Sequence, residues 1–100
     1  MPAYRLAIPP HVAERIRHLA PDLKRAIREA LRALVIDPGR GEPLKRELQK
    51  YLKYRVRRFR IVYGVDRKSK AVIVMAIAHR RSVYEETAAA MRPRANEDIG

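Results

Sequence analysis

The chain has 100 residues, 47% of them hydrophobic, and its 23 lysines and arginines outweigh 11 acidic residues, so the net charge is +12. This composition fits one folded domain and excludes a disordered basic tail, and a folded domain this basic usually binds nucleic acid, a ribosome or an acidic protein. The absence of cysteine excludes disulfides, thiol catalysis and thiolate metal sites, and it fits the cytoplasm. We find no signal peptide and no long apolar run, so we expect no membrane association.

The first third of the chain predicts one strand and two helices. Residues 4–8 alternate in polarity as a short strand does, and two prolines stop them. Apolar residues recur at helical spacing over residues 11–19, which predicts a helix. A second helix begins at Pro21 and ends before Asp37-Pro38-Gly39, which is a strong stop signal. Because the break between these helices is short, we expect an antiparallel helix hairpin that lies on a sheet.

The most informative stretch covers residues 53–63, where basic and apolar residues alternate with the period of a strand. If Arg57-Arg58 forms a tight turn, the two halves pair as a hairpin with one face apolar in register. On the other face Arg55 lies opposite Arg60, with Lys53 close by. Like charges across a ladder destabilise a hairpin, which indicates a bound anion, and phosphate suits arginine best. The same pattern is also typical of a solvated sheet face or of an edge that resists aggregation.

The segments around this hairpin complete the prediction. A connector over residues 40–50 leads into the hairpin, and two leucines pin it to the core. Residues 71–78 are apolar on both faces, so we expect a central strand there. A short helix follows over residues 82–91, with Ser82 as its N-cap and acidic residues in its first turn.

The predicted order is a strand, a two-helix hairpin, a three-stranded antiparallel meander that completes one sheet, and a C-terminal helix. This is a small α+β domain, and we expect its helices on one face of the sheet. Residues 1–91 make up the domain, and residues 92–100 are predicted to be a flexible tail.

A second group of candidate residues follows the central strand, namely His79, Arg80, Arg81 and Tyr84. In a single meander these residues can converge with the basic residues of the hairpin. Such a patch suits RNA cleavage, in which a ribose 2′-hydroxyl attacks its adjacent phosphate while cations hold that phosphate and offset its developing charge. An aromatic ring such as Tyr84 can stack on a base, and His79 is a side chain that titrates near neutrality and can transfer a proton.

Each of these residues also has a purely structural interpretation. Tyr84 can pack a helix against the sheet, and His79 can be a hydrogen-bonding residue at a strand end. Arg57 and Arg58 are typical turn residues that touch phosphate without specificity. The sequence has no paired carboxylates, no Ser/His/Asp set and no Walker motif, and its three histidines lack metal-ligand spacing.

Two segments carry a family pattern. Residues 44–66, LKRELQKYLKYRVRRFRIVYGVD, are similar to a connector that leads into a YRxRxxxYRIxY hairpin, and residues 74–86, VMAIAHRRSVYEE, are similar to the ending IxHRxxVY. At this spacing they resemble the RelE/ParE superfamily of toxins from bacterial and archaeal toxin–antitoxin systems, over nearly the whole chain to about Met91. Toxins of the RelE branch are ribonucleases that cut mRNA in the ribosomal A site, whereas the ParE branch shares the fold but poisons DNA gyrase. The chain resembles the RelE branch more, because it has basic hairpin positions and both Arg80 and Tyr84.

The resemblance implies a ribosome-dependent mRNA endonuclease toxin without metal or organic cofactor, neutralised by an acidic, RelB-like antitoxin in a hetero-oligomer. The catalytic positions are matched by Lys53, Arg55, Arg60, Arg80 and Tyr84, and the residues expected to assist RNA binding are Arg57, Arg58, His79 and Arg81. One departure is the turn, where the family commonly has Gly-Asp and this chain has Arg57-Arg58, which are less suited to positive φ. Two alternatives stay open: a ParE-like gyrase inhibitor, and a non-enzymatic domain that binds RNA or the ribosome.

Overall fold

The computed structural model describes residues 3–91 of the chain. In chain order its elements are β1 (Arg5–Ala7), α1 (Pro10–Arg17), α2 (Pro21–Ile36), the 3-10 turn η1 (Pro38–Arg40), β2 (Glu42–Pro43), the 3-10 turn η2 (Arg46–Leu48), β3 (Leu52–Val56), β4 (Phe59–Asp66), β5 (Ala71–His79) and α3 (Val83–Met91). The predicted α+β class and order of elements are confirmed. The predicted tail over residues 92–100 lies outside the described residues.

The described strands form one sheet in the order β1-β5-β4-β3-β2. The strands β3, β4 and β5 are the predicted antiparallel meander, while β1 runs parallel to β5 and makes β5 an internal strand, as predicted. The short strand β2 was not predicted. It pairs Glu42 with Lys53 and Pro43 with Leu52 at the sheet edge, where proline is tolerated.

Both N-terminal helices begin with a proline in the first turn, where its missing N–H costs nothing. Their apolar stripes are buried against the sheet, with Val12 and Ile16 on α1 and Ile27 and Leu34 on α2. Together with inward-facing residues of β3, β4 and β5, among them Ile61, they make the larger core of the molecule, here called the first core.

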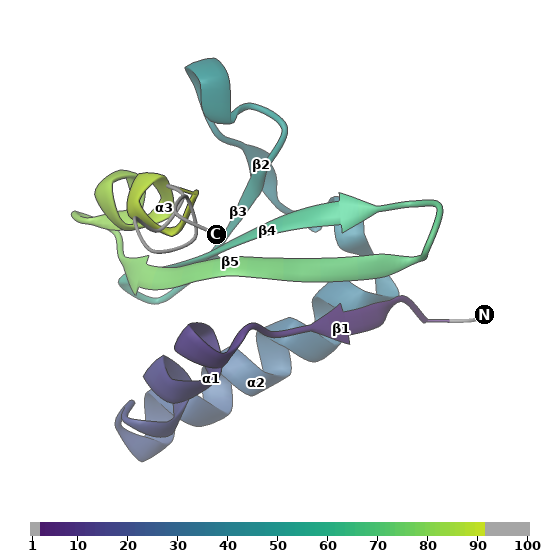
Figure 1. The fold of residues 1–100 in the computed structure, drawn as a ribbon. Coiled ribbons are helices and arrows are strands. Elements are labelled where there is room, and N and C mark those ends of the chain that lie inside the picture. Colours follow the sequence, from purple (N-terminus) through teal and green to yellow (C-terminus); the bar gives the residue numbers. More distant parts are fainter. Residues whose placement is uncertain (1–2, 92–100) are drawn as a thin grey trace, which may run out of the picture.

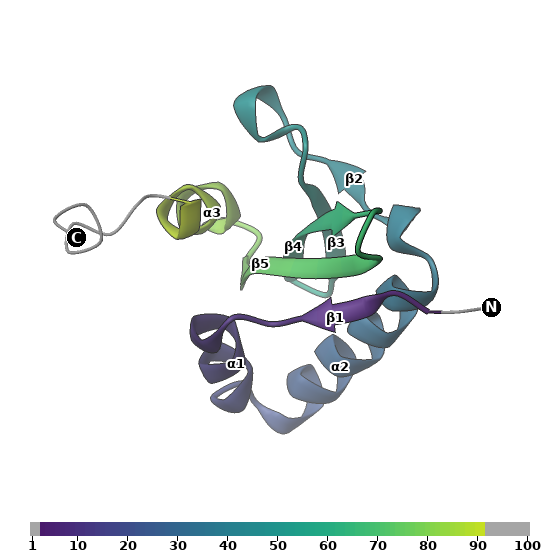
Figure 2. The same cartoon turned by 45° about the vertical axis from the view of Figure 1, so that its right-hand side comes forward.

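The third helix lies on the other side of the sheet (Figures 1 and 2), so the expectation that all helices share one face was wrong. The helix α3 covers a smaller cluster of buried residues, here called the second core. Its members are Leu44, Val62, Ala76, Ala78 and Val83. The connector is pinned as predicted, because Leu44 is buried in this cluster and Leu48 packs against it.

A β-bulge in β5 explains why this strand feeds both cores. Val62 pairs with Ala76 and the next residue of β4, Tyr63, pairs with Val74, so Met75 is an extra residue in β5. The extra residue shifts the side-chain alternation of β5, because successive residues of a strand face opposite sides. Val74 therefore lies in the first core and Ala76 in the second.

The segment after α2 is fixed to the sheet by Tyr63. Its buried hydroxyl donates to the carbonyl oxygen of Pro38 at 2.7 Å and accepts the backbone N–H of Gly41 at 2.9 Å. Burial raises the pKa of Tyr63, so the phenol stays protonated and keeps its donor. A Cβ on Gly41 would lie 2.6 Å from that hydroxyl oxygen and 2.9 Å from the carbonyl oxygen of Lys53, so only glycine fits there.

Candidate nucleic-acid interface

The structure has the hairpin register that the sequence predicts. Val56 pairs with Phe59, Tyr54 with Ile61, and Arg55 with Arg60, so the turn consists of residues 57 and 58. Arg57 adopts a positive φ of 56°, a region that glycine occupies at less cost. An arginine at this position therefore strains the turn.

Three basic side chains of the hairpin stand on the sheet face that carries α3. Lys53, Arg55 and Arg60 alternate with the residues of the first core, so they face the opposite side. From α3, the ring of Tyr84 joins them, with the Lys53 Nζ atom 5.8 Å from its centroid. We call this surface, with Arg80 added, the basic face: Lys53, Arg55, Arg60, Arg80 and Tyr84.

The guanidinium of Arg60 lies among the other positive charges of the basic face. Partial burial lowers the pKa of its guanidinium, and the charges of Arg55 and Arg80 lower it further. Its Nη1 donates to the carbonyl oxygens of Phe59 at 2.8 Å and Arg57 at 3.2 Å. The guanidinium is thus held at the turn, in a field of like charge that a bound anion would relieve.

Arg80 is tied to the hairpin through its backbone. Its N–H donates to the carbonyl oxygen of Arg58 at 2.7 Å, which joins the end of β5 to the turn between β3 and β4. The predicted convergence of the hairpin with the end of the central strand therefore holds for Arg80. Arg57, Arg58 and Arg81, which are next to this junction in the sequence, have exposed side chains.

His79 does not join the basic face, contrary to our expectation. It pairs with Phe59, and the two rings meet edge to face on the first-core side of the sheet, with centroids 5.7 Å apart. Its Nδ1 accepts the backbone N–H of Arg81 at 3.2 Å. These are the contacts of a hydrogen-bonding residue at a strand end.

Sequence reasoning missed one acidic residue of this region. Glu42 on β2 pairs directly with Lys53, and paired residues project on the same face. Its carboxylate partly offsets the effect of Arg55 and Arg80 on the pKa of Arg60. No pattern in the sequence marks Glu42, because a two-residue strand that ends in proline shows no alternation.

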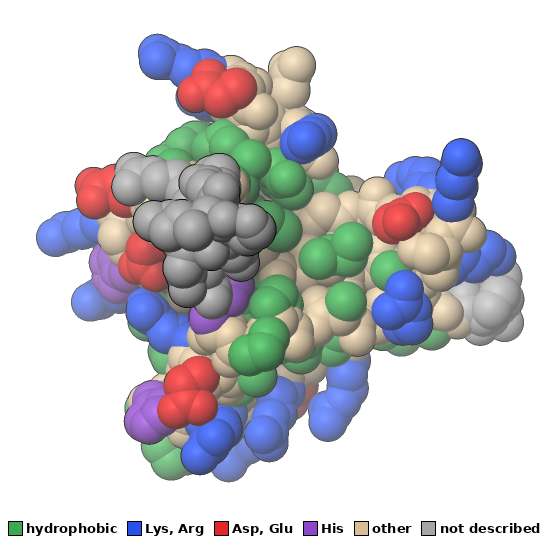
Figure 3. Space-filling model, viewed as in Figure 1, with side chains coloured by type: hydrophobic (Ala, Val, Ile, Leu, Met, Phe, Trp, Pro, Cys, Tyr) green, Lys and Arg blue, Asp and Glu red, His purple; other side chains and the backbone are tan. Residues whose placement is uncertain are grey.

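Charge alone does not locate this surface. In Figure 3 lysine and arginine side chains stand on several parts of the molecule, including the turn between β4 and β5 and the helices below the sheet. The basic face is distinguished by the direct pairing of like charges and by the aromatic ring beside them.

Comparison with known proteins gives the family. The family model of the ParE toxin of type II toxin–antitoxin systems matches residues 5–84. The chain belongs to this toxin family. It is therefore a toxin of a type II toxin–antitoxin system, and the predicted membership of the RelE/ParE superfamily is confirmed.

Solved structures of similar fold come from both bacteria and archaea. The RelBE2 toxin–antitoxin complex of Mycobacterium tuberculosis matches with 26% identity and a TM-score of 0.72, over 79% of this chain and 100% of that one. The isolated RelE toxin of Escherichia coli matches with 20% identity and a TM-score of 0.67, over 90% of this chain and 100% of that one. The archaeal RelE–RelB complex of Pyrococcus horikoshii matches with 21% identity and a TM-score of 0.66, over 79% and 97%. A comparison with curated proteins gave no match.

Two further observations bear on the toxin. Within residues 3–91, no helix has the length and apolar character needed to cross a bilayer. The family model bears the ParE name, whereas the similar structures quoted above are RelE toxins, so the comparisons do not choose between the two branches.

Proposed function

We propose that this toxin is a RelE-like, ribosome-dependent mRNA endonuclease whose basic face holds the scissile phosphate. The observation that carries the proposal is the direct pairing of Arg55 with Arg60, beside Arg80 and the Tyr84 ring. Like charges held together across a ladder destabilise the pairing of the strands, and a phosphate that accepts hydrogen bonds from several guanidinium groups would offset their repulsion.

The proposed reaction needs little more than positioning and charge. The 2′-oxygen of a ribose attacks its own 3′-phosphorus, which forms a 2′,3′-cyclic phosphate as the bond to the 5′-oxygen of the next nucleotide breaks. Lys53, Arg55, Arg60 and Arg80 hold the phosphate in line and stabilise the charge that develops on its oxygens. Tyr84 stacks on an adjacent base and fixes its orientation. Arg57, Arg58 and Arg81 contact the flanking backbone.

The proton of the 2′-hydroxyl and the proton taken up by the leaving 5′-oxygen need their own carriers. Because the His79 imidazole faces the other side of the sheet, we assign this role to the basic face itself. Lys53 and Tyr84 of that face, and Glu42 beside Lys53, are side chains able to exchange a proton, since arginine stays protonated. To find which residue transfers a proton, we would measure the cleavage rate against pH for Glu42→Gln and Tyr84→Phe. Replacing the residue that carries the proton should remove one limb of the pH–rate profile.

An acidic antitoxin fits the same surface. The M. tuberculosis and P. horikoshii structures are complexes of such toxins with their antitoxins. With a net charge of +12, this toxin would attract an acidic, RelB-like partner, which would cover the basic face or displace α3. The active toxin would then work in the cytoplasm, where ribosomes present the mRNA, and the neutralised one would be a hetero-oligomer.

Primer extension on a defined mRNA in a purified translation system tests the proposal. Wild type, Arg80→Ala and the control Arg28→Ala, on the exposed side of α2, are each compared with and without ribosomes. We expect wild type and Arg28→Ala to cleave only with ribosomes, and Arg80→Ala to lose at least about 100-fold in rate, the size of a lost charge-stabilising group. Equal cleavage by Arg80→Ala would remove that residue from the site.

The ParE match favours a second candidate, inhibition of DNA gyrase by binding alone. In that case mRNA stays intact while persistent gyrase–DNA breaks accumulate in cells that express the toxin. Tight, salt-sensitive RNA binding with neither outcome would select the non-enzymatic RNA-binding domain.

A further inference from the structure

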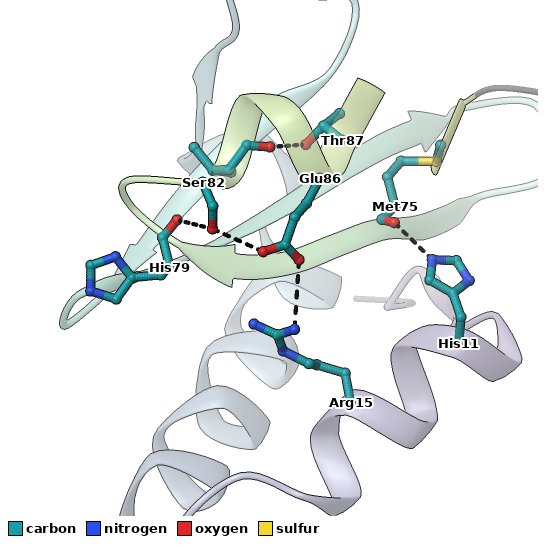
Figure 4. A network of polar contacts seen from close by, with 8 residues as sticks. His11, Arg15, Met75, His79, Ser82, Glu86 and Thr87 are labelled. Atoms are coloured by element: carbon teal, nitrogen blue, oxygen red, sulfur yellow. Dashed lines mark hydrogen bonds and ion pairs between the residues drawn. The ribbon is translucent and has the colours of Figure 1, made fainter. Parts of the chain in front are cut away.

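We propose that Arg15 on α1 and Glu86 on α3 are positioning residues that set the rotation of α3 and thereby hold Tyr84 over the basic face. This inference rests on the proposed function for the importance of Tyr84, while the mechanical claim stands on the contacts of α3. Figure 4 shows these contacts, with Arg15 reaching from α1 toward Glu86.

The surface under α3 combines small and larger side chains. Val83 and Thr87 are the buried residues of this helix, and the second core pairs the small Ala76 and Ala78 of β5 with Val62 of β4 and Leu44 of the connector. The hydroxyl of Thr87 donates to the carbonyl oxygen of Val83, within the same helix, at 2.7 Å. Because alanine side chains offer few atoms for a helix to interlock with, the β5 contacts fix the rotation of α3 less closely than large side chains would, and a polar contact on its flank adds to them.

Helical geometry places Tyr84 and Glu86 on opposite flanks of this buried stripe. Each residue turns the helix by about 100°, so these two side chains diverge by about 200°. Val83 and Thr87 lie one turn apart on the face between them. Tyr84 is therefore directed to Lys53 on β3, and Glu86 to Arg15 on α1. A roll of α3 that releases Glu86 from α1 also moves Tyr84 relative to Lys53.

Both carboxylate oxygens of Glu86 are engaged. Oε1 lies 3.6 Å from the Arg15 Nη1, and Oε2 accepts the hydroxyl hydrogen of Ser82 at 2.8 Å. Ser82 directly precedes α3, and its hydroxyl donates to this carboxylate instead of capping a first-turn amide as the sequence suggested. The carboxylate thus joins the start of α3 to α1.

The helix α1 is the fixed partner in this pair. Val12 and Ile16 bury it in the first core, and its His11 imidazole Nε2 donates to the Met75 carbonyl oxygen at the bulge, at 3.2 Å. Between α1 and α3 lies a hollow of about 350 Å³ over the edge of β5, with Arg15 and Glu86 among its lining residues. Since β1 pairs only with the start of β5, no described strand covers this edge, and the ion pair bridges the gap.

The test compares Glu86→Gln with Glu85→Gln. Both changes remove one negative charge from the first turn of α3, but Glu85 makes no ion pair with a described residue. The direct readout is the nuclear Overhauser effect between the Tyr84 ring and the Lys53 side chain, together with amide hydrogen exchange of α3. We expect Glu86→Gln and Arg15→Gln to weaken the Overhauser effect by about half and to speed exchange about three- to tenfold, the scale of one partly exposed ion pair.

Exchanging the two charges provides the rescue. In Arg15→Glu combined with Glu86→Arg the pair is re-formed, so the Overhauser effect and slow exchange should return. If Glu86→Gln and Glu85→Gln give the same Overhauser effect and the same hydrogen exchange, the inference is overturned. This conclusion does not depend on whether the toxin cleaves mRNA.

Cleavage of mRNA is the second readout and separates the two claims. When the Tyr84 ring is no longer held in place, as expected in Glu86→Gln and Arg15→Gln, kcat should fall about tenfold. KM should change little, because the phosphate contacts remain. If the Overhauser effect falls but wild type cleaves no mRNA, the positioning stands and the proposed function fails. If cleavage by Glu86→Gln is intact while the Overhauser effect falls, the pair still sets α3, and the role of Tyr84 in the proposed reaction is overturned instead.

Discussion

The two faces of the sheet differ in what they contain. The face under α1 and α2 buries large aliphatic side chains, with Ile27, Leu34 and Ile61 fully inaccessible to solvent. The face under α3 buries a smaller cluster and carries the paired arginines of the hairpin. We infer that the larger core on one face supplies most of the stability of the fold. The fold can therefore tolerate the repulsion between like charges on the other face.

The largest effect should come from breaking the first core. Ile27→Ala removes three carbons from a fully buried site, and we expect the free energy of unfolding to fall by about 2–5 kcal/mol. Val83→Ala in the second core should lower the free energy of unfolding by less than about 2 kcal/mol, because this substitution removes fewer carbons and the cluster it affects is smaller. Urea denaturation of both variants measures the difference. Equal losses would contradict the division of stability between the faces.

The buried hydroxyl of Tyr63 should give the next largest effect. Tyr63→Phe leaves the carbonyl of Pro38 and the N–H of Gly41 without this partner, which should cost about 1–3 kcal/mol. Thermal unfolding is the measurement, and Tyr4→Phe, at a half-buried residue with a weak hydroxyl contact, is its control. A fully stable Tyr63→Phe would mean that water replaces the lost hydroxyl.

An anion should stabilise the basic face. Burial and the neighbouring arginines lower the pKa of Arg60, so its charged form is less favourable in the folded chain than in the unfolded chain. This penalty applies at every pH below the lowered pKa, hence throughout the neutral range, and is lost only as pH rises through it. Phosphate at ten times its dissociation constant should raise the free energy of unfolding by about 1.4 kcal/mol.

The variant Arg60→Gln should lose most of this gain, whereas the control Arg28→Gln should keep it. Sodium chloride at the same ionic strength corrects for general screening. The same gain in chloride as in phosphate would show that no specific anion site exists.

The smallest effect concerns the turn. Asparagine tolerates positive φ better than arginine, so Arg57→Asn should raise the free energy of unfolding by about 0.5 kcal/mol. Arg58→Asn is the matched control, because φ at that residue is not positive, and its stability should not change. Chemical denaturation resolves the pair, and a destabilised Arg57→Asn would mean that the arginine side chain itself supports the turn.

The sequence predicts the hairpin better than it predicts what surrounds it. Alternation between basic and apolar residues determines the pairing of Arg55 with Arg60, since a slip of one residue would bury the charges. The strand over residues 71–79 has no such alternation, because it is apolar on both faces. The bulge at Met75 therefore left no signal, and with it the side to which His79 points was missed.

The sequence also does not predict where α3 and Glu42 lie, because neither has an informative local pattern. Helix α3 is rich in alanine and only weakly amphipathic, so its pattern does not say which face of the sheet it covers. Glu42 owes its place beside Lys53 to a strand of two residues. Both depend on tertiary packing, which local patterns do not encode.

The central claim is that the paired arginines serve RNA cleavage and not the fold, and one variant tests it most directly. We would measure ribosome-dependent mRNA cleavage and thermal stability of Arg60→Gln beside Arg28→Gln. The account predicts that Arg60→Gln loses at least about 100-fold in cleavage rate while its melting temperature is no lower than that of wild type, and that Arg28→Gln keeps both. Full cleavage by Arg60→Gln, or a loss of cleavage that merely follows a loss of stability, would contradict the account.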